Sequence, residues 1–163
     1  MNEEQNKRAQ ESLIEGKSYF NLAFLQYMQS NAAYNDYLNS ADVVIGMSGG
    51  EGWGLPEFQS VGLGKHAVIL NAHAYKEWAT PENSVLVEPS GKTEAYDGFF
   101  FRQGMPFNQG NIFSFEEEAF IDGCEQAIKR VESNRDNSEG LKIQEDFTYE
   151  KTLEMLLKEI NNI

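Results

Sequence analysis

The chain has 163 residues and a formal net charge of −13, because 26 aspartates and glutamates outnumber 13 lysines and arginines. Its length allows one ordinary domain, and its acidity argues against binding to nucleic acids or to an anionic membrane surface. A single cysteine, Cys124, excludes an intramolecular disulfide and a cysteine-based metal site, and two histidines disfavour a zinc site. No apolar run is long enough to span a membrane, and the polar N-terminus is unlike a signal peptide, so we expect a cytoplasmic protein.

The first part of the chain is predicted to be helical. Large apolar side chains recur over residues 2–37 as a stripe, which Gly16 and the polar Gln29–Asn31 interrupt. A second short helix is expected over Ala33–Asn39. Residues 1–36 are therefore expected to form an N-terminal helical segment, and residues 37–163 the rest of a single structural domain.

Three short apolar runs predict strands of a parallel sheet. They are Ala41–Met47, which we expect to be buried on both faces, Ala67–Leu70 and Ser84–Val87. Helices are expected between them, over Pro56–Val61 and Ala74–Ala79. Strands and helices that alternate at this spacing indicate right-handed crossovers and an α/β layer architecture.

The C-terminal third is predicted to begin with an irregular loop over residues 88–113, which holds the aromatic cluster Phe99–Phe101. Ser114 and Glu117 form a capping box that predicts the start of a helix there. Its apolar face is expected to comprise Phe120, Cys124, Ala127, Ile128 and Val131. A polar linker over Asn134–Gly140 then leads to a last helix capped by Thr148. Its inward-facing residues are expected to be Leu153, Leu156, Leu157 and Ile160.

The most informative segment is a glycine-rich loop between the first strand and the helix that follows it. It reads Ser-Gly-Gly-Glu-Gly-Trp-Gly-Leu-Pro over residues 48–56, with four glycines within six residues. Glycine lets a backbone approach a ligand closely, and the first N–H groups of a helix suit a phosphate or a sugar hydroxyl. Ligands of open α/β sheets bind outside the carboxyl ends of the strands, where this loop lies. The alternative is a turn that only lets the strand and the helix pack together.

This loop and the apolar run Ala41–Ile45 before it resemble the donor-site signature of retaining glycosyltransferases of the GT-B fold, in the large family of sucrose-synthase-like and mannosyltransferase-like enzymes. Further matches follow at Gly64–Val68, Trp78–Val87 and Phe147–Tyr149, so the resemblance covers residues 34–163. It implies a partial Rossmann-like, three-layer α/β/α fold with a short parallel sheet. Residues 37–163 would then be the nucleotide-sugar-binding half of such an enzyme.

The resemblance also implies roles for individual residues. Glu51 would contact the transferred sugar of a nucleoside diphosphate sugar near the reacting centre. The backbone that would hold sugar hydroxyls and phosphate belongs to Gly50, Gly52, Trp53, Gly54 and Leu55. The family's second glutamate, which binds ribose, is Gln59 here, and an amide keeps a hydrogen bond but not the charge. Glu57 is not expected to replace it, because two residues on a helix lie about 200° apart. His73, in the loop after the second strand, is a further candidate contact to the donor.

The implied reaction is transfer of a hexosyl group with retention of configuration, without a metal or another cofactor. The cations that neutralise the diphosphate in the family, and its acceptor domain, have no counterpart in this sequence, so we expect the chain to be incomplete alone. Two alternatives stay open. The chain could be a non-catalytic or regulatory module that binds a sugar nucleotide. It could also be one subunit of a split enzyme, in which an acceptor-domain partner or a second copy covers an exposed sheet edge.

Overall fold

A computed structural model describes residues 3–15, 17–25, 27–96, 98 and 100–162. The chain divides into two compact units, Met1–Tyr34 and Asn35–Ile163, and the boundary falls within helix α2 (Asn31–Ser40). Gly16, which was expected to interrupt the N-terminal helix, and Phe99 of the aromatic cluster lie outside the described residues.

The first unit begins with helix α1 (Glu3–Leu13), in which Arg8 and Glu4 form an ion pair one turn apart at 2.6 Å. The prediction of a helix over residues 2–37 is wrong for the described residues between 17 and 28, which form no regular element. Phe20 and Tyr27 of the apolar stripe are 103% and 91% exposed. A short helix gains most of its stability from packing an apolar face, and this stripe is not packed. The second predicted helix is confirmed as α2.

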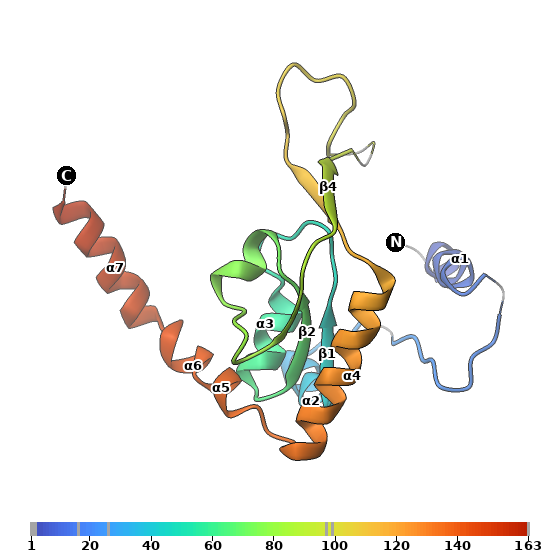
Figure 1. Cartoon of the computed structure of the whole chain (residues 1–163), viewed down its shortest axis with the longest axis horizontal. Helices are drawn as coiled ribbons and strands as arrows, with labels where there is room; N and C mark the ends of the chain where they lie inside the picture. The colour runs from blue at the N-terminus through green and yellow to red at the C-terminus, as the bar shows by residue number, and fades with distance from the viewer. Residues whose placement is uncertain (1–2, 16, 26, 97, 99, 163) are drawn as a thin grey trace. The chain divides into compact units, whose positions relative to one another are not determined.

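The second unit is built on a parallel sheet of three strands in the order β1–β2–β3 (Figure 1). The strands are β1 (Val43–Gly46), β2 (His66–Leu70) and β3 (Val85–Val87). Val43 is paired with His66, and Val68 with Val85. The three predicted strands and the α/β class are therefore confirmed.

Helices cover both faces of this sheet. Helix α3 (Leu55–Gly62) packs on one face, where Val61 joins a core with Ala67 and Ile69 of β2. Helix α4 (Glu117–Ser133) packs on the other, where Ala127 joins Val68 of β2 in a second core. Because alternate side chains of β2 enter opposite cores, every residue of this central strand is buried.

The outer elements of these layers are less buried than the sequence suggests. Strand β1 is an edge strand, and Ile45 is 50% exposed, so the expected burial of its two faces is wrong at this residue. On α4, Ile128 is likewise exposed, whereas Cys124 packs against the second core as expected. After β2, the chain forms a 3₁₀-helix, η1 (His73–Glu77), where a short helix over Ala74–Ala79 was predicted.

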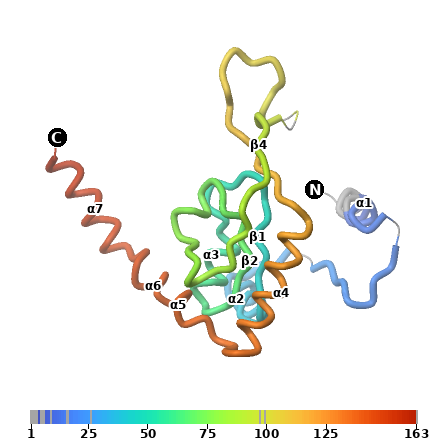
Figure 2. Tube along the Cα trace, viewed as in Figure 1, coloured from blue at the N-terminus to red at the C-terminus, as the bar shows by residue number. Residues whose placement is uncertain are grey.

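A two-stranded antiparallel hairpin replaces the irregular loop predicted for residues 88–113. Its strands are β4 (Gly91–Glu94) and β5 (Asn111–Ser114), and the long connection between them projects beyond the sheet (Figure 2). Ser114 is the last residue of β5 and does not cap α4, which has no side-chain cap hydrogen bond; the Ser114 hydroxyl lies 3.4 Å from that of Ser90. Helix α4 starts three residues later, with Glu116 at the N-cap position.

Three helices complete the chain: α5 (Ser138–Leu141), α6 (Ile143–Asp146) and α7 (Tyr149–Asn161). The predicted cap is confirmed, because the Thr148 hydroxyl accepts a hydrogen bond from the Lys151 N–H at 3.2 Å. The expectation that α7 buries its apolar side is wrong, since the helix has no buried residue and leads away from the sheet (Figure 1). None of the described helices has both the length and the apolar character needed to cross a membrane.

Candidate functional site

A pocket of about 580 Å³ opens at the carboxyl end of β1, and we call it the loop pocket. The glycine-rich loop contributes Ser48–Gly52, and η1 contributes His73. The hairpin and its connection contribute Ala95, Phe101 and Gly110–Ile112. The volume lies within the range of small-molecule binding sites. The loop pocket is therefore the first candidate for a functional site.

The glycines of the loop serve two different purposes. A Cβ atom on Gly49 would lie 2.6 Å from the Phe113 carbonyl oxygen, because β5 packs directly on the loop backbone. Gly54 has φ +74°, and a Cβ atom there would lie 2.1 Å from Cε1 of Tyr75. By contrast, a Cβ atom on Gly52 would have no neighbour within 4 Å. A Cβ atom on Gly50 would lie 3.9 Å from its nearest neighbour, the Asn111 carbonyl oxygen. Packing thus requires glycine at positions 49 and 54, whereas Gly50 and Gly52 leave open backbone in the loop pocket.

His73 connects the loop to the end of β2. Its Nε2 lies 2.8 Å from the Ser48 carbonyl oxygen and must carry a proton, because a carbonyl oxygen only accepts hydrogen bonds. In the neutral ring Nδ1 is then an acceptor, and it is buried without a hydrogen-bond partner among the described residues. The backbone of His73 has φ +41°, which is uncommon for a residue with a side chain. The structure therefore holds this histidine in one orientation at the pocket.

Glu57 lies beneath the glycine-rich loop, whereas Gln59 lines another pocket, so the two side chains face apart as helix geometry predicted. The Cγ of Glu57 lies 2.8 Å from where a Cβ atom on Gly46 would be. Its Oε2 lies 3.1 Å from where a Cβ atom on Gly54 would be. The buried Tyr75 side chain also lies close to both positions, with its hydroxyl near Gly46 and its ring near Gly54. Burial raises the pKa of Glu57, and the charge of Glu51 adds to the rise. The carboxylate of Glu51 in the loop is therefore close enough to act on the carboxylate of Glu57 beneath it.

We expect Glu57→Gln to change how stability depends on pH. A carboxyl group whose pKa is higher in the folded chain than in the unfolded chain binds more protons when folded, so stability falls as pH rises through that interval. The interval starts at the ordinary glutamate value of 4.5. The amide does not titrate and loses no stability in this way. Urea unfolding should therefore show that the stability of the variant rises relative to the wild type above that pH. Glu159→Gln, on exposed α7, serves as the control, and parallel pH profiles for Glu57→Gln and the wild type would contradict the assignment.

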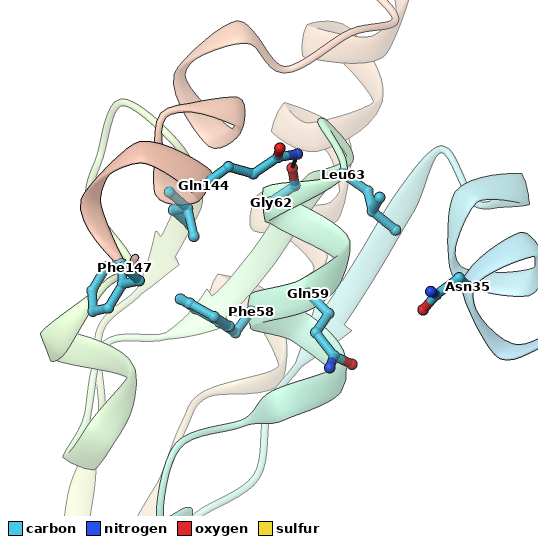
Figure 3. Close-up of a pocket in the computed structure, with 8 residues that line it drawn as sticks. Asn35, Phe58, Gln59, Gly62, Leu63, Gln144 and Phe147 are labelled. Atoms are coloured by element: carbon cyan, nitrogen blue, oxygen red, sulfur yellow. Dashed lines mark hydrogen bonds between the residues drawn. The ribbon is translucent and has the colours of Figure 1, made fainter. Parts of the chain in front are cut away.

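Gln59 does not share a pocket with Glu51. It lines a second pocket of about 370 Å³ beside α3, between Asn35 and a group that includes Phe58, Gln144 and Phe147 (Figure 3). The side chain of Gln144 closes one end by donating a hydrogen bond to the Gly62 carbonyl. The two residues that the family resemblance assigns to one donor thus face different cavities.

Trp53 and Leu55 are also outside the loop pocket. The Trp53 ring contacts Phe58 edge-on, with the ring centroids 5.5 Å apart, and its carbonyl accepts a hydrogen bond from Trp78 Nε1 at 2.9 Å. Leu55 begins α3 and is exposed. Of the predicted site residues, the structure brings together Gly50, Glu51, Gly52 and His73. It places Trp53, Gly54, Leu55 and Gln59 elsewhere.

No sequence pattern indicated that the hairpin would line the pocket. Phe101, Asn111 and Ile112 line it, and only the aromatic cluster at residues 99–101 marked this region as unusual. No lysine or arginine belongs to the described lining. Among the residues that the structure describes, no group of three or more histidine, cysteine, aspartate or glutamate side chains is placed to hold a metal ion.

Comparisons of the chain with protein-family models, curated proteins and solved structures found no match. A functional proposal therefore depends on the geometry of the loop pocket and on the resemblance of the loop sequence.

Proposed function

We propose that residues 37–163 bind a nucleoside diphosphate sugar, as the donor-binding half of a retaining glycosyltransferase with a partial Rossmann-like fold. One observation carries the proposal: open backbone at Gly50 and Gly52, the Glu51 carboxylate and His73 meet in one pocket. The pocket lies at the carboxyl ends of parallel strands, where open α/β sheets bind their ligands.

Glu51 is the residue suited to act at the reacting centre. Its carboxylate accepts hydrogen bonds from sugar hydroxyls, and its negative charge favours the positive charge that develops on the sugar as the bond to the diphosphate breaks. In the proposed complex, N–H groups of the open loop backbone would donate hydrogen bonds to ligand oxygens. His73 stiffens this arrangement through its hydrogen bond to the Ser48 carbonyl.

The lack of cations in the described lining favours a second candidate function. A leaving diphosphate gains negative charge, and side chains of arginine or lysine normally stabilise it. The chain would then be a non-catalytic sugar-nucleotide-binding module, or a subunit whose partner supplies those cations. Strand β1 lies at the edge of the parallel sheet, where a partner chain or a second copy could extend the sheet through backbone hydrogen bonds.

Calorimetric titration with UDP-, GDP- and ADP-hexoses tests the proposal. We expect binding by the wild type and a loss of about tenfold or more in Glu51→Ala, because a hydrogen bond to a charged group contributes about 1.5–3 kcal/mol. Gln59→Ala, in the second pocket, is the matched control and should bind as the wild type does. Absence of binding at millimolar ligand would refute the donor-binding function, and equal binding by Glu51→Ala would refute the site.

A light-scattering measurement of mass separates the candidate functions. A dimer, or a complex that forms with an acceptor-domain protein and gains transfer activity, supports the subunit function. A monomer that binds the nucleotide sugar and never transfers it supports the non-catalytic module.

A further inference from the structure

The hydrogen-bonding groups that line the loop pocket are mostly acceptors. The Ser48 hydroxyl donates to the Gly50 carbonyl at 3.2 Å, and His73 Nε2 donates to the Ser48 carbonyl at 2.8 Å, so both of these donors are already used. The Glu51 carboxylate accepts only, and the Asn111 amide can do both. A ligand that donates hydrogen bonds therefore matches the described side chains better than one that accepts them.

The charges around the pocket point the same way. Glu51 lines it and Glu57 lies beneath the loop, whereas no lysine or arginine belongs to its described lining. The N-terminus of α3 offers little compensation, because Glu57 lies in the first turn of that helix and already places a negative charge there. A phosphate in this pocket would meet the Glu51 carboxylate, with that of Glu57 beneath the loop, and the Asn111 amide and backbone N–H groups would be its donors.

An uncharged polyol suits the same surroundings. Phe101 and Ile112 provide an apolar side on which the C–H face of a sugar ring can lie. Glu51 can accept hydrogen bonds from the ring hydroxyls, and Asn111 can exchange them. The open backbone at Gly50 and Gly52 lets the ring approach the loop closely.

We infer that the loop pocket recognises the uncharged hexose end of its ligand and contributes nothing to holding phosphates, so that a simple hexoside binds without a nucleotide. The inference rests on the proposed function for the choice of a sugar ligand. It goes beyond that function because it assigns the binding affinity to the hexose part of the nucleotide sugar and not to the nucleotide part.

Calorimetry with three matched sets of ligands tests this inference. The sets are methyl hexopyranosides of glucose, mannose, galactose and N-acetylglucosamine, the corresponding nucleoside diphosphate sugars, and free UDP, GDP and ADP. We expect one glycoside to bind within about threefold of its nucleotide sugar, and the free nucleotides not to bind at millimolar concentration. Between low and high salt the Kd of the glycoside should change less than about twofold, because screening acts on charged pairs.

Variants locate the binding. Glu51→Gln and Phe101→Ala should each weaken glycoside binding about tenfold, and Gln59→Ala should leave it unchanged. Free nucleotides that bind as tightly as nucleotide sugars, without glycoside binding, would overturn the inference and leave the proposed function standing. Glycoside binding without nucleotide-sugar binding would support the inference and refute the proposed function. If no ligand binds, both fail, and glycoside binding that neither pocket variant weakens would overturn the inference.

Discussion

Replacing Gly54 with alanine is expected to destabilise the fold by roughly 3 kcal/mol. A side chain in the left-handed region costs about 1–2 kcal/mol, and overpacking a filled space costs about 1–3 kcal/mol more. Both apply here, because φ is +74° and the new Cβ atom would lie 2.1 Å from the buried Tyr75 ring. Urea unfolding monitored by circular dichroism would measure the change.

Gly52→Ala is the matched control for this experiment, because it makes the same change two residues away. A Cβ atom on Gly52 meets nothing within 4 Å, so its stability should stay within about 0.5 kcal/mol of the wild type. The pair separates a glycine that the fold requires from a glycine that only leaves room for a ligand. Equal stability of the two variants would show that Gly54 is not held against Tyr75 as the structure has it.

Local rules were sufficient for strand β2 and for the N-terminal cap of α7. The continuous apolar run of β2 predicts a strand buried on both faces, and every residue of that strand is buried. The cap at Thr148 depends only on a hydroxyl and an N–H three residues later, and it forms as predicted. The cap does not depend on where the rest of the chain lies, whereas the burial of β2 also requires α3 and α4 on its two faces.

Predictions failed where burial depends on a distant surface. The apolar stripe around Phe20 and the amphipathic side of α7 have a helical spacing, yet neither is packed in the structure. The hairpin at residues 91–114 also escaped prediction. Its strands are mostly exposed, so no alternation of buried and exposed residues marks them.

In the candidate site, too, local geometry was predictable, whereas features that depend on tertiary packing were not. The family resemblance implied that Glu51 and His73 contact one donor. The structure brings both into the loop pocket, because each follows a parallel strand and the carboxyl ends of these strands share one sheet edge. Helical geometry also indicated correctly that Glu57 and Gln59 face apart. It could not indicate which of them faces the loop, because that depends on how Gly54 and Tyr75 set the start of α3.

Asn137 lies in the segment that was predicted to be a polar linker, yet its side chain is buried and joins three parts of the chain. Its Nδ2 donates to the carbonyls of Lys65, at 3.0 Å, and Asn83, at 2.7 Å. Its Oδ1 accepts from the Gly140 N–H at 3.0 Å. The side chain thus connects α5 with the starts of β2 and β3.

We expect Asn137→Asp to be more destabilising at neutral pH than Asn137→Ala, although aspartate has nearly the same shape. Alanine leaves buried groups without partners, at a cost of about 1–3 kcal/mol. Aspartate instead places a buried charge against the carbonyl oxygens of Lys65 and Asn83, which we expect to cost about 3–5 kcal/mol. Urea unfolding at neutral pH would rank the two variants.

The pH dependence of the aspartate variant identifies the cause. Buried beside two carbonyl oxygens, the new carboxyl group should hold its proton more tightly in the folded chain, so its cost should shrink as pH falls and the group becomes a donor. The alanine variant should show no such recovery. Asn134→Ala, which loses an exposed hydrogen bond to the Asp136 N–H, should change stability by less than about 1 kcal/mol. An aspartate variant as stable as the wild type at neutral pH would mean that the two carbonyls do not depend on this amide.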